Sequence, residues 1–139
     1  MLYPKEAIEK AGAWMEGDTR AKLWLQESNY EELVQLKDAV SRYPKAFEYL
    51  LINKHFVLAA FVNSIWDDKK ALKLLMDKKE FFWAAMSNYI NGDENAHVFL
   101  IKNNLKHYAD LAHKIQAKIR KEGDDRTGLF NSGPFKIEK

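Results

Sequence analysis

The sequence predicts an all-α fold, a right-handed α-α superhelix (solenoid) of about four and a half two-helix repeats. The first reason is a period of 25 residues, because the segments that begin at Ala21, Ala46, Ala71 and Ala96 align without a gap. The second reason is that apolar residues within each segment recur at the spacing of an amphipathic helix. The third reason is that the middle segments are more apolar than the outer ones, as a stack with two exposed ends requires.

Residues 4–16 form the predicted opening helix. Ile8, Ala11 and Met15 lie at positions i, i+3 and i+7, the spacing of one helix face. The second helix of every repeat carries apolar residues at the same three positions. We therefore expect a second helix without its first, followed by four hairpins, which makes nine helices in the chain.

Each 25-residue unit is predicted to form two short helices. In the first helix, the leading alanine is followed at i+3 and i+4 by Trp24-Leu25, Tyr49-Leu50, Leu74-Leu75 or Phe99-Leu100. Because a close helix crossing needs a small side chain, we expect the alanines to mark these crossings. The second helix repeats Leu33, Leu58, Trp83 and Tyr108, then Leu36, Phe61, Met86 and Leu111, then Val40, Ile65, Ile90 and Ile115.

Signals for helix starts and ends recur with the same period. Three of the first helices follow an aspartate at one repeat position: Asp18, Asp68 and Asp93. A carboxylate there can accept hydrogen bonds from the free amides of the first turn. In the second unit Tyr43 takes this position, and Pro44 follows at the first helical position, where its missing amide would have gone unpaired. Gly17 and Gly92 suit the left-handed residue that ends a helix.

The outer repeats differ from the inner ones in polarity. Phe56 and Phe81 in the middle units correspond to Glu31 in the first unit and Lys106 in the last. Inner units meet a neighbour on both sides, whereas terminal units are expected to meet water on one. This gradient favours repeats that stack in chain order.

The repeat domain is predicted to span residues 1–121, followed by an extended C-terminal tail over residues 122–139. Glycines and a proline interrupt any helix there, at Gly123, Gly128, Gly133 and Pro134. Four large apolar residues lie between them: Leu129, Phe130, Phe135 and Ile137. The tail is either an unstructured end or a segment that lies back along the repeats, and the sequence leaves both open.

The unit, an alanine followed by an aromatic residue and leucine at i+3 and i+4, resembles a shortened tetratricopeptide or HEAT hairpin. It resembles more closely the units of uncharacterised bacterial helical-repeat proteins. The resemblance covers residues 4 to about 118 and implies an α-solenoid that binds partners along an elongated surface. The chain departs from tetratricopeptide repeats in its period, which is about 34 residues there, and in lacking their W-x-x-L-G-x-x-Y motif. Their peptide-binding residues therefore have no counterpart in this chain.

Composition narrows the class of protein. The chain has no cysteine, so disulfides and thiolate chemistry are excluded. Lys5, Glu6, Glu9 and Lys10 stand where a signal peptide would need an apolar run. No stretch approaches the roughly 18 apolar residues of a membrane span, so we expect a cytoplasmic protein with no membrane partner.

The histidines show no pattern of a metal or catalytic site. The sequence holds no HExxH or comparable spacing, and no Gly-rich phosphate loop. His107 and His113 are too far apart around a helix to share a ligand. Asp110 and His113 could pair, but an exposed Asp-His pair is more often a surface ion pair than an acid-base couple. We therefore expect that the protein is not an enzyme and that it binds no metal and no cofactor.

One repeat position is polar within an otherwise apolar helix, and it carries Asp38, Asn63, Asn88 and His113. Asparagine is a poor helix-interior residue unless solvent or a ligand rewards it. Amides on successive helices can bond the main chain of an extended peptide. The candidate binding residues are Asn63 and Asn88 with the aromatic side chains near them: Phe56, Trp66, Phe81 and Tyr89.

These residues lead to the first functional hypothesis, a non-catalytic protein or peptide interaction scaffold. The alternative for the same residues is that the asparagines are a solvated stripe and the aromatic side chains belong to the core between repeats. Exposed aromatic side chains in the central units could equally serve a homodimer.

The second functional hypothesis is nucleic-acid binding through a basic C-terminal helix face. The formal net charge is +2, but residues 102–121 hold six basic and one acidic side chain. Lys114, Lys118 and Lys121 recur at i, i+4 and i+7, a cationic stripe that could follow a phosphate backbone. A solubilising cap on the last repeat would give the same pattern.

Overall fold

The computed structural model describes residues 2–125, with side chains for residues 2–123, and these residues form an all-α fold. The helices are α1 (Lys5–Met15), α2 (Thr19–Glu27), α3 (Glu31–Val40), α4 (Pro44–Ile52), α5 (Phe56–Ile65), α6 (Lys69–Asp77), α7 (Phe81–Ile90), α8 (Glu94–Lys102) and α9 (Lys106–Asp125). Within the described residues, the predicted nine helices are confirmed. The last helix continues past Lys121, the expected end of the repeat domain. Residues 126–139 of the predicted tail lie outside the described residues.

The predicted helix starts are confirmed at the capping residues. Asp18 accepts hydrogen bonds from the amides of Arg20 and Ala21, and Asp68 accepts them from the amides of Lys70 and Ala71. Asp93 caps α8 in the same way through the amide of Asn95, while Tyr43 precedes α4 without a side-chain cap. The aspartates thus compensate amides that would otherwise lack a partner within the helix.

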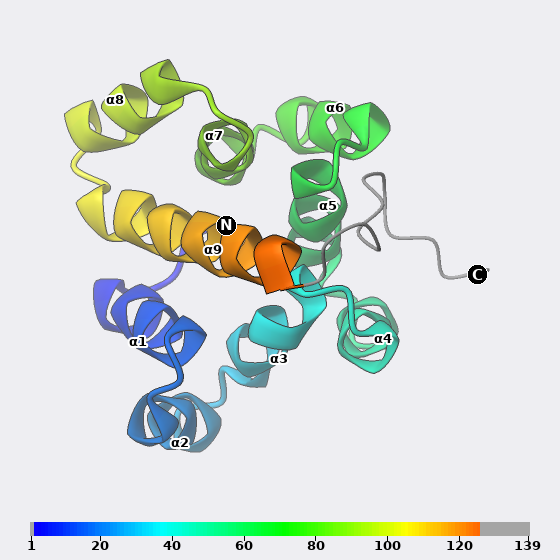
Figure 1. The fold of residues 1–139 in the computed structure, drawn as a ribbon, viewed down its shortest axis with the longest axis vertical. Coiled ribbons are helices and arrows are strands. Elements are labelled where there is room, and N and C mark those ends of the chain that lie inside the picture. The colour runs from blue at the N-terminus through cyan, green and yellow to red at the C-terminus, as the bar shows by residue number, and fades with distance from the viewer. Residues whose placement is uncertain (1, 126–139) are drawn as a thin grey trace.

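The helices are arranged as a ring of inner helices with outer helices around it (Figure 1). The inner ring consists of α1, α3, α5, α7 and α9, in which each helix packs against the next and α9 packs against α1. The outer helices α2, α4, α6 and α8 each lie against the two inner helices that precede and follow them. The first and last helices of the described chain are therefore neighbours.

The positions that repeat along the sequence form the core. Ala21, Ala46, Ala71 and Ala96 are all buried, and so are the three apolar positions of each inner helix. Trp83 lies among aromatic neighbours, with ring centres 5.1 Å from Phe61 and 5.7 Å from Tyr108. The aromatic side chains of α5, α7 and α9 thus meet inside the ring.

From the polarity gradient we expected the polar residues of the terminal repeats to face water. Several of them instead contact other residues of the protein. The hydroxyl of Tyr3 donates a hydrogen bond to Glu32 at 2.9 Å, and the backbone amide of Tyr3 donates to the hydroxyl of Tyr108 at 2.8 Å. His107 is half-buried beside α1, close enough to Lys5 and Glu9 to feel their charges. Because the ring brings the terminal helices together, these polar residues find partners at the junction.

None of the helices in the described part of the chain is both long and apolar enough to cross a lipid bilayer.

Candidate functional site

An apolar groove lies over α7, between α6 and α8, with a volume of about 380 Å³. One end is formed by large side chains, Met76 from α6, Phe81 from α7 and Phe99 from α8. The exposed fractions of these side chains are 46%, 44% and 39%, respectively. A partner could therefore bury substantial apolar surface at this end, which favours binding.

The floor and the other end of the apolar groove have a different character. Ala84 and Ala85 of α7 and Ala96 of α8 form a floor of small side chains. Polar groups follow at the far end. Asn88 contributes an amide from α7, and Asp93 and Asn95 contribute a carboxylate and an amide from the start of α8. The groove can hold a bulky apolar side chain at one end and satisfy main-chain or side-chain donors at the other.

The structure separates the predicted binding residues into accessible and buried ones. Phe81 and Asn88 line the apolar groove together, and Phe56 is exposed at the start of α5. Asn63 is half-buried, as is Asn88. Trp66 and Tyr89, in contrast, are only 5% and 7% exposed and offer a partner little surface.

Both buried aromatic residues have partners within the fold. The indole nitrogen of Trp66 donates to the carbonyl of Val40 at 3.2 Å, and the guanidinium of Arg42 lies 5.0 Å from the ring centre. The hydroxyl of Tyr89 shares a hydrogen bond with Nδ1 of His113 at 2.9 Å. These contacts connect neighbouring inner helices, so Trp66 and Tyr89 belong to the core as the alternative interpretation expected.

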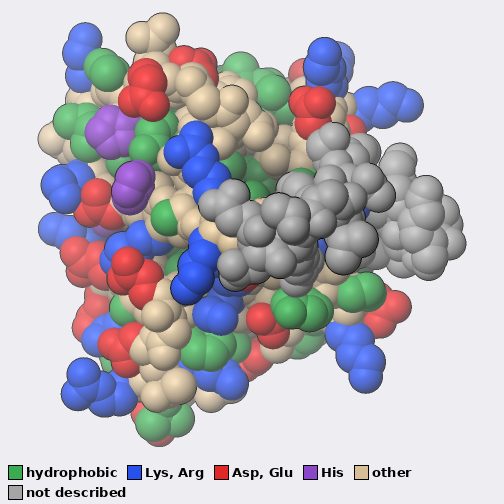
Figure 2. Space-filling model, viewed as in Figure 1, with side chains coloured by type: hydrophobic (Ala, Val, Ile, Leu, Met, Phe, Trp, Pro, Cys, Tyr) green, Lys and Arg blue, Asp and Glu red, His purple; other side chains and the backbone are tan. Residues whose placement is uncertain are grey.

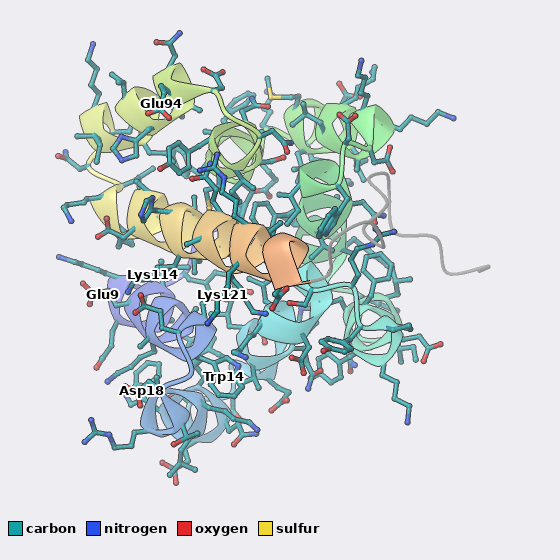
Figure 3. All side chains as sticks on the ribbon, viewed as in Figure 1. Glu9, Trp14, Asp18, Glu94, Lys114 and Lys121 are labelled. Carbon is teal, nitrogen blue, oxygen red and sulfur yellow. The ribbon has the colours of Figure 1, made fainter. Side chains whose placement is uncertain are left out.

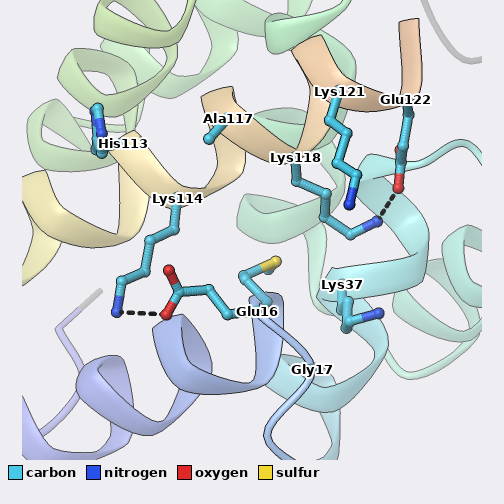
Figure 4. A pocket seen from close by; sticks show the side chains of 10 residues that line it. Glu16, Gly17, Lys37, His113, Lys114, Ala117, Lys118, Lys121 and Glu122 are labelled. Carbon is cyan, nitrogen blue, oxygen red and sulfur yellow. Dashed lines mark hydrogen bonds and ion pairs between the residues drawn. The ribbon is translucent and has the colours of Figure 1, made fainter. Parts of the chain in front are cut away.

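A basic pocket of about 620 Å³ lies where α1, α3 and α9 meet (Figure 4). Its charged lining consists of Lys37, Lys114, Lys118, Lys121, Glu16 and Glu122. Lys114 and Lys121 point from α9 toward α1 and the region of Trp14 (Figure 3). In the space-filling view, Lys and Arg side chains gather over α9 and its border with α1 (Figure 2). The three lysines of the predicted stripe thus line a recess together with a fourth lysine from α3.

The lysines of the basic pocket differ in their partners. Lys114 lies 3.4 Å from a carboxylate oxygen of Glu16 on α1. Lys118, with a side chain only 12% exposed, bonds both Glu122 and the hydroxyl of Ser41, which also donates to Glu122 at 2.7 Å. This hydrogen-bond network connects Ser41, directly after α3, to Lys118 and Glu122 near the end of α9.

A smaller pocket of about 370 Å³ lies near the junction of α1 and α9, lined by Lys5, Glu9, His107 and Asp110 among others. Burial, and then the positive charge of Lys5, lower the pKa of His107, while Glu9 and Asp110 act in the opposite direction. Asp110 pairs with Lys106 at 2.8 Å, while Nδ1 of His113 shares its hydrogen bond with the hydroxyl of Tyr89. No group of three or more His, Asp or Glu side chains within residues 2–123 is placed to hold a metal ion.

Several site residues were missed by sequence reasoning. Met76 and Phe99 lie on outer helices; Phe99 was predicted only as part of the apolar face of its helix, and Met76 was not identified from the sequence. Lys37 occupies the repeat position that carries Gly12, Val62, Ser87 and Ala112 in the other units. A lysine at a position that is otherwise small or apolar was the signal that could have identified it.

The fold and these sites define an all-α protein of helical hairpins with an apolar groove and a basic pocket. No family model, curated protein sequence or solved structure matches the chain.

Proposed function

We propose that the protein is a non-catalytic interaction module, a short superhelix of hairpins that binds an apolar segment of a protein or peptide partner in the apolar groove. The observation that carries the proposal is the exposure of Met76, Phe81 and Phe99 at one end of a concave surface. Exposed apolar side chains are common singly, but a group that rims a groove is typical of interaction sites.

The chemistry of the apolar groove indicates the kind of partner. Asp93 is the single formal charge in its lining, so the groove does not select a highly charged ligand. The alanine floor leaves space for one or two bulky apolar side chains, which would fit against Phe81 and Phe99. Asn88 and Asn95 can then bond the main chain of the same segment, as in other grooves that recognise short peptides.

Nucleic-acid binding has less support from the same structure. Lys114 and Lys118 already pair with glutamates, and Lys118 is largely buried. The lysines converge in a recess, whereas a duplex backbone needs a row of exposed cations that follows its path. The groove therefore carries the proposal.

The test begins with selection of binders from a random peptide library on the full chain. The affinity of an enriched, fluorescently labelled peptide is then measured by anisotropy for the wild type and for Phe81→Ser and Phe99→Ser. We expect each substitution to weaken binding by about tenfold, because buried aromatic anchors commonly contribute more than about 1 kcal/mol. Leu23→Ser on α2 is the matched control, since Leu23 is 53% exposed and lies outside the groove.

Equal affinity of all variants for the enriched peptides would contradict the proposal. Analytical ultracentrifugation of the wild type and Phe81→Ser distinguishes a second copy of the chain as the occupant. If the wild type is a dimer and Phe81→Ser is a monomer, the groove binds a second copy of the chain and not a peptide partner.

A further inference from the structure

The side chains that line the basic pocket carry more positive than negative charge, counted over residues 2–123. Four lysines and two glutamates line it, which leaves a formal charge of +2 when His113 is neutral. Glu16 pairs with Lys114, and Glu122 pairs with Lys118. Lys37 and Lys121 have no carboxylate partner among residues 2–123. The two unpaired ammonium groups come from different helices, α3 and α9, and face one recess.

Lys37 is held in position by an aromatic side chain. Its ammonium lies 4.8 Å from the ring centre of Trp14, and the indole nitrogen of Trp14 donates to the carbonyl of Val34 at 3.1 Å. Lys22 approaches the same ring at 5.1 Å. A cation–π contact orients an ammonium group without neutralising its charge. The charge of Lys37 is therefore available to a ligand in a preorganised position.

The shape of the basic pocket limits the size of the ligand. Its volume of about 620 Å³ lies within the range of small-molecule sites, which is about 300–1,000 Å³. Met15 and Ala117 contribute apolar surface to the lining, and lysine stems add more. A compound with an anionic group and a compact organic part would fill such a recess, whereas a polymer could place only one unit in it.

We infer that the basic pocket binds a small phosphate monoester, with the phosphate between Lys37 and Lys121. A phosphate monoester carries close to two negative charges above its second pKa of about 6, which matches the uncompensated charge of the lining. Lysine ammonium groups bind phosphate as mobile point charges with three donors each. The glutamate oxygens can accept hydrogen bonds from hydroxyl groups on the organic part. This site is separate from the apolar groove, so it stands whether or not the groove binds a peptide.

The inference is tested by NMR titration of the full, ¹⁵N-labelled chain with phenyl phosphate at pH 8 and constant ionic strength. We expect saturable shifts at the backbone amides of Gly17, Lys37 and Ala117, which lie in the lining. Benzenesulfonate has a similar organic part but a single charge, and we expect it to bind at least about tenfold more weakly.

The variant Lys37→Gln with Lys121→Gln should weaken phenyl phosphate binding at least about tenfold. Lys45→Gln with Lys69→Gln removes the same charge from exposed sites on α4 and α6 and should change affinity less than about twofold. Lys37→Arg with native Lys121 keeps the charge and the contact with Trp14, so it should retain binding. It shows whether loss of affinity in the first variant comes from charge or from altered folding.

Four results would overturn the inference. These are the absence of saturation below about 10 mM phenyl phosphate, equal binding of benzenesulfonate, and equal losses in the test and control variants. The fourth is that a single-stranded oligonucleotide binds in a manner that depends on Lys37 and Lys121, while phenyl phosphate does not bind. That result would establish a nucleic-acid site instead.

Discussion

At the scale of single residues, Ser87 is an exception among the buried polar side chains that the structure describes. Its hydroxyl is fully buried in α7 and has no hydrogen-bond partner among the described residues. Ser64 in α5 is also buried, but its hydroxyl donates to the carbonyl of Phe61 at 2.7 Å. A buried polar group without a partner costs free energy, whereas a bonded one costs little.

We therefore predict opposite effects of the same substitution at these two serines. Ser87→Ala should raise the free energy of unfolding by about 1 kcal/mol, because it removes an unpaired hydroxyl. Ser64→Ala should lower it by about 0.5–1.5 kcal/mol, because it removes a hydrogen bond. Helix propensity changes equally in both, so urea denaturation of the pair isolates the hydroxyl. A stability loss in Ser87→Ala would show that its hydroxyl does have a partner.

Tyr3 is the residue by which the N-terminal segment is joined to the ring. Its ring lies 5.7 Å from that of Tyr30 and 6.3 Å from that of Trp83, and its hydroxyl donates to Glu32. Tyr3→Phe keeps the ring and removes the hydrogen bond to a charged acceptor. We expect this substitution to lower the free energy of unfolding at pH 7 by about 1–3 kcal/mol. Tyr43→Phe, at an exposed tyrosine, is the control and should change it by less than about 0.5 kcal/mol.

The same tyrosine predicts how stability depends on alkaline pH. Burial, followed by the charge and hydrogen bond of Glu32, raises the pKa of Tyr3 far above its ordinary value of 10.0. Because the folded-state pKa is above the unfolded one, the contribution of Tyr3 is fully present below pH 10 and is lost as pH rises beyond it. The stability difference between wild type and Tyr3→Phe should shrink when urea denaturation is repeated above pH 10. A constant difference would contradict the assignment.

At the scale of helices and their connections, left-handed residues end the helices with the repeat period. Gly17, Arg42, Asp67 and Gly92 have φ values of 96°, 68°, 71° and 106°. Asn29, Lys54, Lys79 and Asn104 form a second such series, with φ between 60° and 66°. The glycine positions were predictable, whereas Arg42, Lys54 and Lys79 were not, because arginine and lysine have no preference for the left-handed region. The unit's geometry imposes the conformation even where the side chain disfavours it.

A pair of substitutions at one repeat position tests this point. Asp67→Gly should raise the free energy of unfolding by about 1 kcal/mol, because glycine adopts positive φ without the penalty of a Cβ atom. Gly92→Ala should lower it by at least about 1 kcal/mol. A Cβ atom at Gly92 would have no heavy atom within 4 Å, so the cost arises from the backbone alone. Thermal denaturation that moves both variants in the same direction would contradict the explanation.

The leading alanine of each outer helix makes a further prediction. Ala71 is 7% exposed in α6, where that helix packs against α5 and α7. Ala71→Leu should overpack this crossing and lower the free energy of unfolding by about 1–3 kcal/mol. Lys69→Leu, at an exposed position of the same helix, should have less than about 0.5 kcal/mol of effect in the same urea titration. Equal stability of Ala71→Leu and the wild type would place the crossing elsewhere.

The helices could be predicted from the sequence because their signals are local. Apolar spacing, aspartate caps and glycine ends each act within one turn or one hairpin. Asn88 was a candidate from its repeat position and Phe81 from its nearness to the asparagines, and both line the apolar groove. Trp66 and Tyr89 were candidates on the same basis, with burial between repeats as the open alternative, and they are buried. Whether an aromatic side chain faces a neighbour or solvent depends on the rotation between units. The repeat period of the sequence does not determine the angle of rotation between consecutive units.

At the scale of the whole molecule, contact between α1 and α9 is the feature that the repeat pattern did not predict. A period shows that consecutive units are equivalent, but it does not show how many units complete a turn. Gly12 of α1 lies directly against α9, where a Cβ atom would be 3.3 Å from the Lys114 side chain. The basic pocket follows from this closure, because Lys37 and Lys121 share a recess only when α9 lies beside both α1 and α3.

The contact between α1 and α9 that closes the ring also changes how stability is expected to be distributed among the helices. In an open stack each repeat contacts only its neighbours, so terminal repeats open more easily than the middle. In the ring, α1 has neighbours on both sides, and Ile8 on α1 is fully buried. We predict that the slowest-exchanging amides of α1, α5 and α9 open with similar free energies in native-state hydrogen exchange. Ile8→Ala should lower all three by a similar amount, about 2–5 kcal/mol, because one cooperative unit is destabilised. Fast exchange in α1 with unchanged protection in α5 would instead indicate an open stack with independent ends.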